Sequence, residues 1–124
     1  MFEGCYTALV TPMRDDGSVD YNGLERLIEF QIVSNVQGVL AVGTTGESPT
    51  LLWEEHNEVI ERTVKLANDR CLSIAGTGSN STKETLAGSE HAAHVGADAV
   101  LLVDPYYNGP VSYTHLRAHE TATY

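Results

Sequence analysis

The segment Gly43–Ser48 combines residue types that can bind a small anion. Thr44 and Thr45 supply two hydroxyl groups, and flanking glycines allow the backbone to turn tightly and approach a ligand closely. Hydroxyl and backbone N–H donors can together hold a carboxylate or a phosphate without a fixed positive charge. The segment follows the apolar run 38–42, so an ordinary connection between a strand and a helix is the alternative interpretation.

Two tyrosines lie on a loop near Pro105 and could move a proton. Tyr106 and Tyr107 carry hydroxyls that donate and accept, so either one beside a threonine hydroxyl would form a proton relay. Paired tyrosines also pack at the rim of a site or at a subunit interface, and the residue types leave both interpretations open. The segment Gly76–Gly78 similarly fits a phosphate cradle or a tight turn.

The histidines and lysines predict neither a metal site nor a bound cofactor. Two histidine pairs have metal-ligand spacing but no convincing further ligand; they are His91 with His94, and His115 with His119. Lys65 and Lys83 fall in predicted helices, where neither is suited to form a Schiff base at the end of a strand. No serine or cysteine lies in a recognisable nucleophile motif.

Short apolar runs alternate with helical patterns along the chain. Continuous apolar runs are typical of parallel strands, and here they occupy residues 5–10, 38–42, 72–75 and 99–103. One helix is predicted to begin after Asp20 as its N-cap, and a second to cover 53–67. A third is predicted from the capping-box pattern Ser81–Glu84 to Gly96. This β-α-β-α-β-α-β order predicts right-handed crossovers and a parallel sheet.

The candidate functional residues share one position in this order. The paired threonines, the paired tyrosines, Thr11 and Gly76 each follow the C-terminal end of a predicted strand. Parallel α/β sheets bind their ligands at that end. We therefore expect Thr44, Thr45 and the tyrosine loop to meet at a single mouth.

Composition and charge limit the kinds of partner. The 124 residues include 17 acidic and 7 basic side chains, for a net charge of −10, which disfavours binding to nucleic acid or an anionic membrane. No apolar run approaches the roughly 18 residues of a membrane span. Cys5 and Cys71 are predicted to be reduced core thiols, and a cytoplasmic location is expected. The length fits one small domain, about half of an eight-stranded barrel.

Four motifs together resemble one enzyme family. They are Thr11–Met13, Gly43–Ser48, Ala75–Gly78 and Pro105–Asn108. The pattern resembles the dihydrodipicolinate synthases (4-hydroxy-tetrahydrodipicolinate synthases) of diaminopimelate and lysine biosynthesis, which are pyruvate-dependent class I aldolases. The resemblance implies that residues 1–110 are the N-terminal half of a (β/α)8 TIM barrel, with about four strands and three helices. Residues 111–124 do not fit the family and are predicted to be a tail, either an artefact of a chimeric gene or a divergent segment.

The resemblance also implies a reaction and roles for particular residues. Pyruvate forms a Schiff base with a barrel lysine and condenses with L-aspartate 4-semialdehyde. Thr44 and Thr45 would hold the pyruvate carboxylate, and Thr44 would share a hydroxyl relay with Tyr107 of a neighbouring subunit in a dimer of dimers. The Schiff-base lysine has no counterpart in the printed sequence, so this polypeptide alone is expected to be inactive and poorly stable.

A regulatory site and two other functions are also expectations of the resemblance. Lysine inhibits many family members at the dimer interface, and the matching residues here are Ser48, Trp53, His56, Asn80, Glu84 and Tyr106. Another pyruvate-dependent aldolase, such as N-acetylneuraminate lyase or a sugar-acid aldolase, is one alternative. A non-catalytic half-barrel that binds carboxylates is the other.

Overall fold

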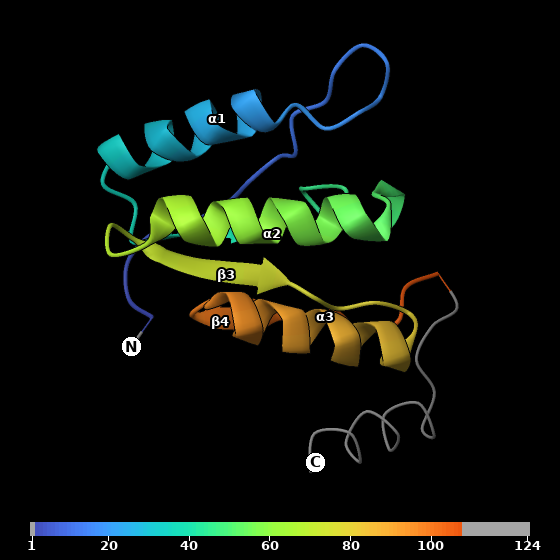
Figure 1. The fold of residues 1–124 in the computed structure, drawn as a ribbon. Coiled ribbons are helices and arrows are strands. Elements are labelled where there is room, and N and C mark those ends of the chain that lie inside the picture. The colour runs from blue at the N-terminus through green and yellow to red at the C-terminus, as the bar shows by residue number, and fades with distance from the viewer. Residues whose placement is uncertain (1, 108–124) are drawn as a thin grey trace.

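The chain alternates strands and helices, as the sequence predicts (Figure 1). The computed structural model describes residues 2–107, so the predicted boundary at 110, the tail 111–124, Asn108, His115 and His119 lie outside the described residues. The elements are β1 (Tyr6–Ala8), α1 (Tyr21–Val33), β2 (Gly38–Ala41), the 3-10 helix η1 (Ser48–Thr50), α2 (Trp53–Ala67), β3 (Leu72–Gly76), α3 (Thr82–Val95) and β4 (Ala99–Leu101).

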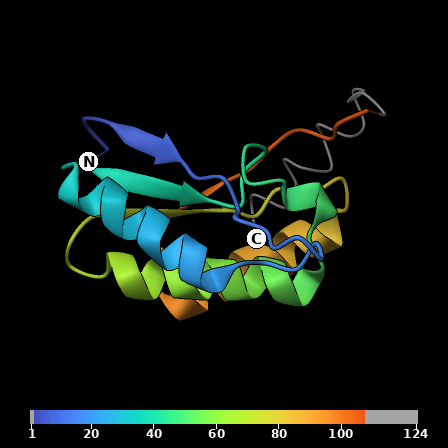
Figure 2. The ribbon, with the colours of Figure 1, turned by 90° about the horizontal axis from the view of Figure 1, so that it is seen from above.

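The four strands form one parallel sheet in the order β1-β2-β3-β4. All three α-helices pack on the same face of this sheet, which Figure 2 shows from above. On that face Val39, Ala41 and Ala75 are buried. The opposite face carries an apolar row across the strands, in which Ala8, Leu40, Ile74 and Ala99 lie in register. In a complete barrel this second face would form the packed interior.

Local signals begin and end the helices where the sequence predicts. The Asp20 carboxylate accepts a hydrogen bond from the Gly23 backbone N–H at 2.9 Å and begins α1. The Ser81 hydroxyl accepts from the Glu84 N–H at 3.4 Å, and Gly96 ends α3 with a left-handed φ of 95°. Only half of the predicted capping box forms at α3, because the Glu84 carboxylate accepts a hydrogen bond from the Ser79 hydroxyl at 2.6 Å instead.

The prediction that both cysteines are core thiols is wrong for Cys5. Cys5 is exposed, and its backbone N–H donates to the Gln37 side-chain oxygen at 2.5 Å. The reason is that β1 begins only at Tyr6 and that, within residues 2–107, no strand pairs with the outer edge of β1. Cys71 is half-buried, and burial raises the pKa of its thiol. Both cysteines are free thiols. Among residues 2–107, no helix is long and apolar enough to span a lipid bilayer.

Candidate functional site

The loop after β2 folds back on itself and uses the N–H donors of its second half. The Gly43 carbonyl accepts hydrogen bonds from the N–H groups of Gly46 at 3.1 Å and Ser48 at 3.3 Å. The Glu47 N–H donates to the Thr44 carbonyl at 3.0 Å. Within the described residues this leaves the N–H groups of Gly43, Thr44 and Thr45 without a backbone acceptor. The free donors predicted for this loop are therefore confined to the first half of the segment, which includes both threonines.

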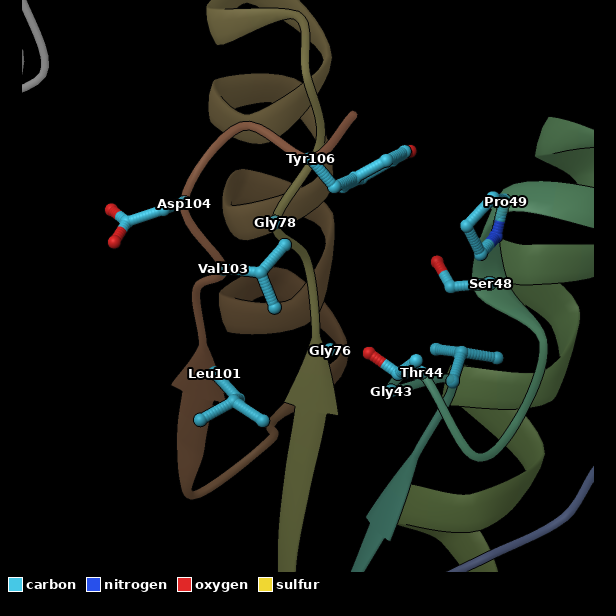
Figure 3. Close-up of a pocket in the computed structure, with 11 residues that line it drawn as sticks. Gly43, Thr44, Ser48, Pro49, Gly76, Gly78, Leu101, Val103, Asp104 and Tyr106 are labelled. Atoms are coloured by element: carbon cyan, nitrogen blue, oxygen red, sulfur yellow. The ribbon is translucent and has the colours of Figure 1, made fainter. Parts of the chain in front are cut away.

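The predicted strand-end mouth exists as a cavity of about 280 Å³. It lies at the C-terminal ends of β2, β3 and β4 (Figure 3). Its lining consists of Val42, Gly43, Thr44, Ser48, Pro49, Gly76, Gly78, Leu101, Val103, Asp104 and Tyr106. This volume is slightly below the range of about 300–1,000 Å³ typical of drug-sized ligands, so the cavity suits a small molecule.

Polar groups in the cavity come mainly from the loop after β2. Figure 3 shows the hydroxyls of Thr44 and Ser48 directed toward the open space, with the Tyr106 ring extending across it. The carboxylate of Asp104 is directed away from the cavity in the same view. An anion in the cavity would therefore meet hydroxyl groups and would not face the nearest carboxylate.

The predicted catalytic and substrate-binding residues lie differently with respect to this cavity. Thr44 lines it, whereas Thr45 is exposed beside it and is not part of the lining. Tyr107 is fully exposed, with a left-handed φ of 68°, and is also not part of the lining. The neighbouring residue Tyr106 lines the cavity instead. A single chain thus brings Thr44 and Tyr106 together but not Thr44 and Tyr107.

The residues predicted for lysine binding form three local groups. Asn80 and Tyr106 are joined by two hydrogen bonds, from the Asn80 amide to the Tyr106 carbonyl at 3.1 Å and from the Tyr106 N–H to Asn80 Oδ1 at 2.6 Å. Trp53 stacks on His56 with ring centroids 5.1 Å apart and an angle of 8° between the planes. Ser48 lines the cavity with Tyr106. The Glu84 side chain is exposed and bonded to Ser79, as described above.

His56 is a buried side chain, which its sequence context did not indicate. It is 3% exposed, and its Nδ1 atom is buried without a hydrogen-bond partner in the described structure. Burial lowers the pKa of His56, and the nearby His91 lowers it further, while the neighbouring Asn57 side chain and Gly76 backbone oppose that change. At neutral pH the imidazole is therefore uncharged, and it packs between Trp53 and the end of β3.

One buried threonine braces the loop after β2, and another bonds to α3. The buried Thr11 hydroxyl donates to the Gly46 carbonyl at 2.7 Å, which ties the end of β1 to the loop after β2. Thr11 was identifiable as a polar residue at a strand end. Thr77 is 1% exposed and shares a hydrogen bond of 2.9 Å with Ser89 of α3. Its role is packing, and nothing in the sequence distinguished it from a ligand-binding threonine.

The glycines of the segment Gly76–Gly78 allow neighbouring strands to approach closely. A β-carbon added at Gly76 would clash with the carbonyl oxygen of Val42, and one added at Gly78 would clash with the Val103 backbone nitrogen. Both glycines line the cavity. Within residues 2–107, no group of three or more His, Cys, Asp or Glu side chains could hold a metal ion.

Comparison with known proteins gives consistent results over nearly the whole chain. The model of the dihydrodipicolinate synthetase family matches residues 1–122. The 4-hydroxy-tetrahydrodipicolinate synthase of Gluconacetobacter diazotrophicus is 50% identical over 126 residues, which cover 99% of this chain and 42% of that protein. The chain therefore spans less than half the length of this relative.

Solved structures agree with this result. The dihydrodipicolinate synthase of Acinetobacter baumannii, solved in complex with pyruvate, matches with a TM-score of 0.90 at 47% identity, over 98% of this chain and 42% of that one. The enzyme from Cyanidioschyzon merolae, solved with lysine bound, matches with a TM-score of 0.87 at 38% identity, over 98% and 42% of the two chains. The sheet and helices described above are the N-terminal half of a TIM barrel. Because this half-barrel coincides with a family match over almost all of its sequence, the chain belongs to the dihydrodipicolinate synthetase family.

Proposed function

We propose that this chain is the pyruvate-binding part of a 4-hydroxy-tetrahydrodipicolinate synthase. The whole protein would condense pyruvate, held as a lysine Schiff base, with L-aspartate 4-semialdehyde in diaminopimelate and lysine biosynthesis, in the cytoplasm. The observation that carries the proposal is Thr44, which combines a hydroxyl at the cavity with an N–H group that has no backbone acceptor. The pyruvate complex of the Acinetobacter relative supports the choice of ligand.

The residues present can orient the acid end of pyruvate. The Thr44 hydroxyl can donate to a carboxylate oxygen, and the N–H groups of Thr44 and Thr45 can donate to the same group. The hydroxyl can also pass a proton between two neighbours, because it donates and accepts at once. Lys65 and Lys83 are exposed on α2 and α3, and neither lines the cavity. The Schiff-base lysine must therefore come from barrel residues that this chain does not contain.

Replacing Thr44 tests the proposal on the chain itself. The substitution Thr44→Val keeps the shape of the side chain but removes its hydroxyl, and should weaken pyruvate binding about tenfold, the loss of roughly one charge-assisted hydrogen bond. Titration followed by NMR chemical shifts of the loop amides measures this. Thr50→Val is a matched control, because the Thr50 hydroxyl donates to the Glu47 carbonyl at 2.9 Å and Thr50 does not line the cavity. Equal affinities for pyruvate in wild type and Thr44→Val would contradict the proposal.

Borohydride reduction in the presence of pyruvate separates binding from chemistry. We expect no covalent adduct on this chain, because Lys65 and Lys83 lie on exposed helix faces away from the cavity. Mass spectrometry of the reduced protein measures this. A pyruvate adduct on either lysine would overturn the assignment of Schiff-base chemistry to the missing part of the barrel.

Tyr107 is proposed to act in the site of a second subunit. In the single chain it is fully exposed and its backbone is in the left-handed region, which is uncommon for a residue with a side chain. A tyrosine held in this way at the rim of a sheet can reach a neighbouring molecule, and the complete protein would be a dimer of dimers. The Tyr107 hydroxyl would then join the relay of the partner's threonine.

Lysine is proposed as an inhibitor of the complete protein. Asn80 and Tyr106 form a rigid polar pair near the exposed carboxylate of Glu84, which could bind an ammonium group. The lysine complex of the Cyanidioschyzon relative supports this proposal. Calorimetric titration of a complete barrel that carries this sequence as its N-terminal half should give a heat of lysine binding, and Glu84→Gln should reduce it. Absence of heat at millimolar lysine would contradict the proposal.

A further inference from the structure

Val42, directly before the threonine loop, has a backbone conformation that its residue type disfavours. Its φ is 49°, in the left-handed region, where a β-branched residue is a genuine outlier. The side chain is 1% exposed and belongs to the hydrophobic core. Strained residues of this kind persist only where surrounding structure determines them, and they gather at functional sites.

Two glycines, one on β3 and one in the loop itself, leave room for this conformation. A β-carbon at Gly76 would clash with the Val42 carbonyl oxygen and lie 2.9 Å from the Gly43 nitrogen. A β-carbon at Gly46 would lie 3.0 Å from the Val42 Cα atom. The backbone of Val42 is thus enclosed by β3 on one side and by its own loop on the other. Its side chain is meanwhile buried in the core, and Val42 also contributes to the lining of the cavity.

The left-handed turn at Val42 determines where Thr44 lies. The strand β2 ends at Ala41, and the turn at Val42 redirects the chain, so that the Gly43 carbonyl meets the N–H groups of Gly46 and Ser48. The redirected chain carries Thr44 to the cavity. We propose that Val42 is a positioning residue, whose core-anchored side chain holds the strained backbone that directs Thr44 at the ligand. The choice of pyruvate as ligand rests on the proposed function.

Two substitutions distinguish positioning from packing because they change side-chain volume and backbone freedom in opposite directions. Val42→Gly removes the whole side chain, but glycine adopts a positive φ without steric cost. Val42→Ala retains a β-carbon but loses the anchor, so its backbone should relax to a negative φ. A purely structural role predicts that alanine is tolerated better than glycine. A positioning role predicts that the conformation of the loop is preserved better by glycine than by alanine.

The primary measurement is amide hydrogen exchange of the full 124-residue chain. The reporters are the Gly46 and Ser48 N–H groups, which bond to the Gly43 carbonyl. Their exchange is compared with that of the Leu72 N–H, which donates to the Gln37 carbonyl at 2.9 Å. This comparison corrects for any general loss of stability, which would speed exchange at all three amides. We expect selective loss of protection at Gly46 and Ser48 in Val42→Ala and substantially less loss in Val42→Gly.

Pyruvate titration of the same variants is the second measurement. Relaxation to a negative φ is favoured for an L-residue, so the binding-competent loop of Val42→Ala should be about tenfold less populated. The affinity for pyruvate should then be about tenfold lower. Val42→Gly should stay within about threefold of wild type, since its loop can still adopt the positive φ. Val39→Ala and Val39→Gly are matched controls, because Val39 is buried on β2 and is not among the residues with positive φ.

The outcomes separate this inference from the proposed function. Greater loop protection or tighter binding in Val42→Ala than in Val42→Gly would overturn the positioning role. The positioning role would also be overturned if the alanine and glycine variants of Val39 showed the same order of loop protection and pyruvate affinity as those of Val42. Failure of the wild-type chain to bind pyruvate would count against the proposed ligand, and the exchange measurements would still decide the role of Val42.

Discussion

Thr44 and His56 illustrate how single residues at this site obtain their properties from their surroundings. Thr44 has a free N–H because the acceptors of its loop bond to the N–H groups of Gly46, Glu47 and Ser48. His56 is uncharged because Trp53 and the end of β3 exclude water from it. Both properties arise from neighbours and not from the residue type. They therefore lead to predictions that depend on the folded state.

The burial of His56 should make the stability of the chain depend on pH. Its pKa in the folded state is lowered below the ordinary value of 6.5, so the unfolded state binds a proton more readily. The stabilisation is therefore complete above that value and is lost as the pH falls toward the lowered pKa. We expect the free energy of unfolding, measured with urea, to fall between about pH 7.5 and about pH 5.5, in part because of His56.

Matched histidine variants isolate this contribution. His56→Gln should flatten the pH dependence of the unfolding free energy. His94→Gln is the control for the substitution itself, because His94 is exposed at the end of α3. An equal pH dependence in wild type and His56→Gln would show that the buried imidazole is not responsible.

At the scale of elements, the helices depend on short-range capping, and the loops depend on contacts between strands. Ser81 caps α3 locally, and the Asn80 beside it binds Tyr106 after β4. The start of α3 is thereby joined to the tyrosine loop. A change at this helix start should affect both the helix and the position of Tyr106.

Removal of the Ser81 cap should destabilise the chain modestly. Ser81→Ala leaves the Glu84 N–H without its acceptor and should lower the free energy of unfolding by about 1 kcal/mol. Ser81→Asp, which preserves a capping oxygen, should retain most of that stability. Urea unfolding measures the difference. Equal losses in both variants would assign the effect to something other than the cap.

At the scale of the whole molecule, residues 2–107 cover the sheet with helices on one face only. The exposed apolar side chains at the β4 edge include Val100, Leu101 and Leu102, which are 41%, 43% and 57% exposed. The outer edge of β4 has no partner strand in the described structure. Exposed apolar surface and an unpaired edge of this kind favour association with another polypeptide.

The remaining part of a barrel should therefore stabilise this chain. Mixing it with the C-terminal part of the Gluconacetobacter relative should lower the binding of an apolar dye and raise the melting temperature, because burial of apolar surface stabilises a folded protein. The N-terminal part of that relative is the matched control, since it duplicates the strands already present. Equal effects of the two fragments would contradict closure of a barrel.

The sequence alone predicted much of this architecture because the relevant signals are local. Asp20, Ser81 and Gly96 begin or end helices through contacts within a few residues, and the apolar runs lie on the strands observed. The motif Gly43–Ser48 was correctly predicted to lie at a cavity, because parallel strands present their C-terminal ends on one side. Cys5 was misplaced because an apolar run does not reveal which of its residues pair in the sheet.

The tertiary structure decided what depends on residues that are distant in the sequence. The positive φ of Val42 requires the absence of a side chain at Gly76 on the next strand, and no pattern around Val42 indicates it. The neutral state of His56 requires its burial against Trp53 and the end of β3. Composition and spacing specify elements, since their energies are local, whereas backbone strain and desolvation arise only when separate elements are packed together.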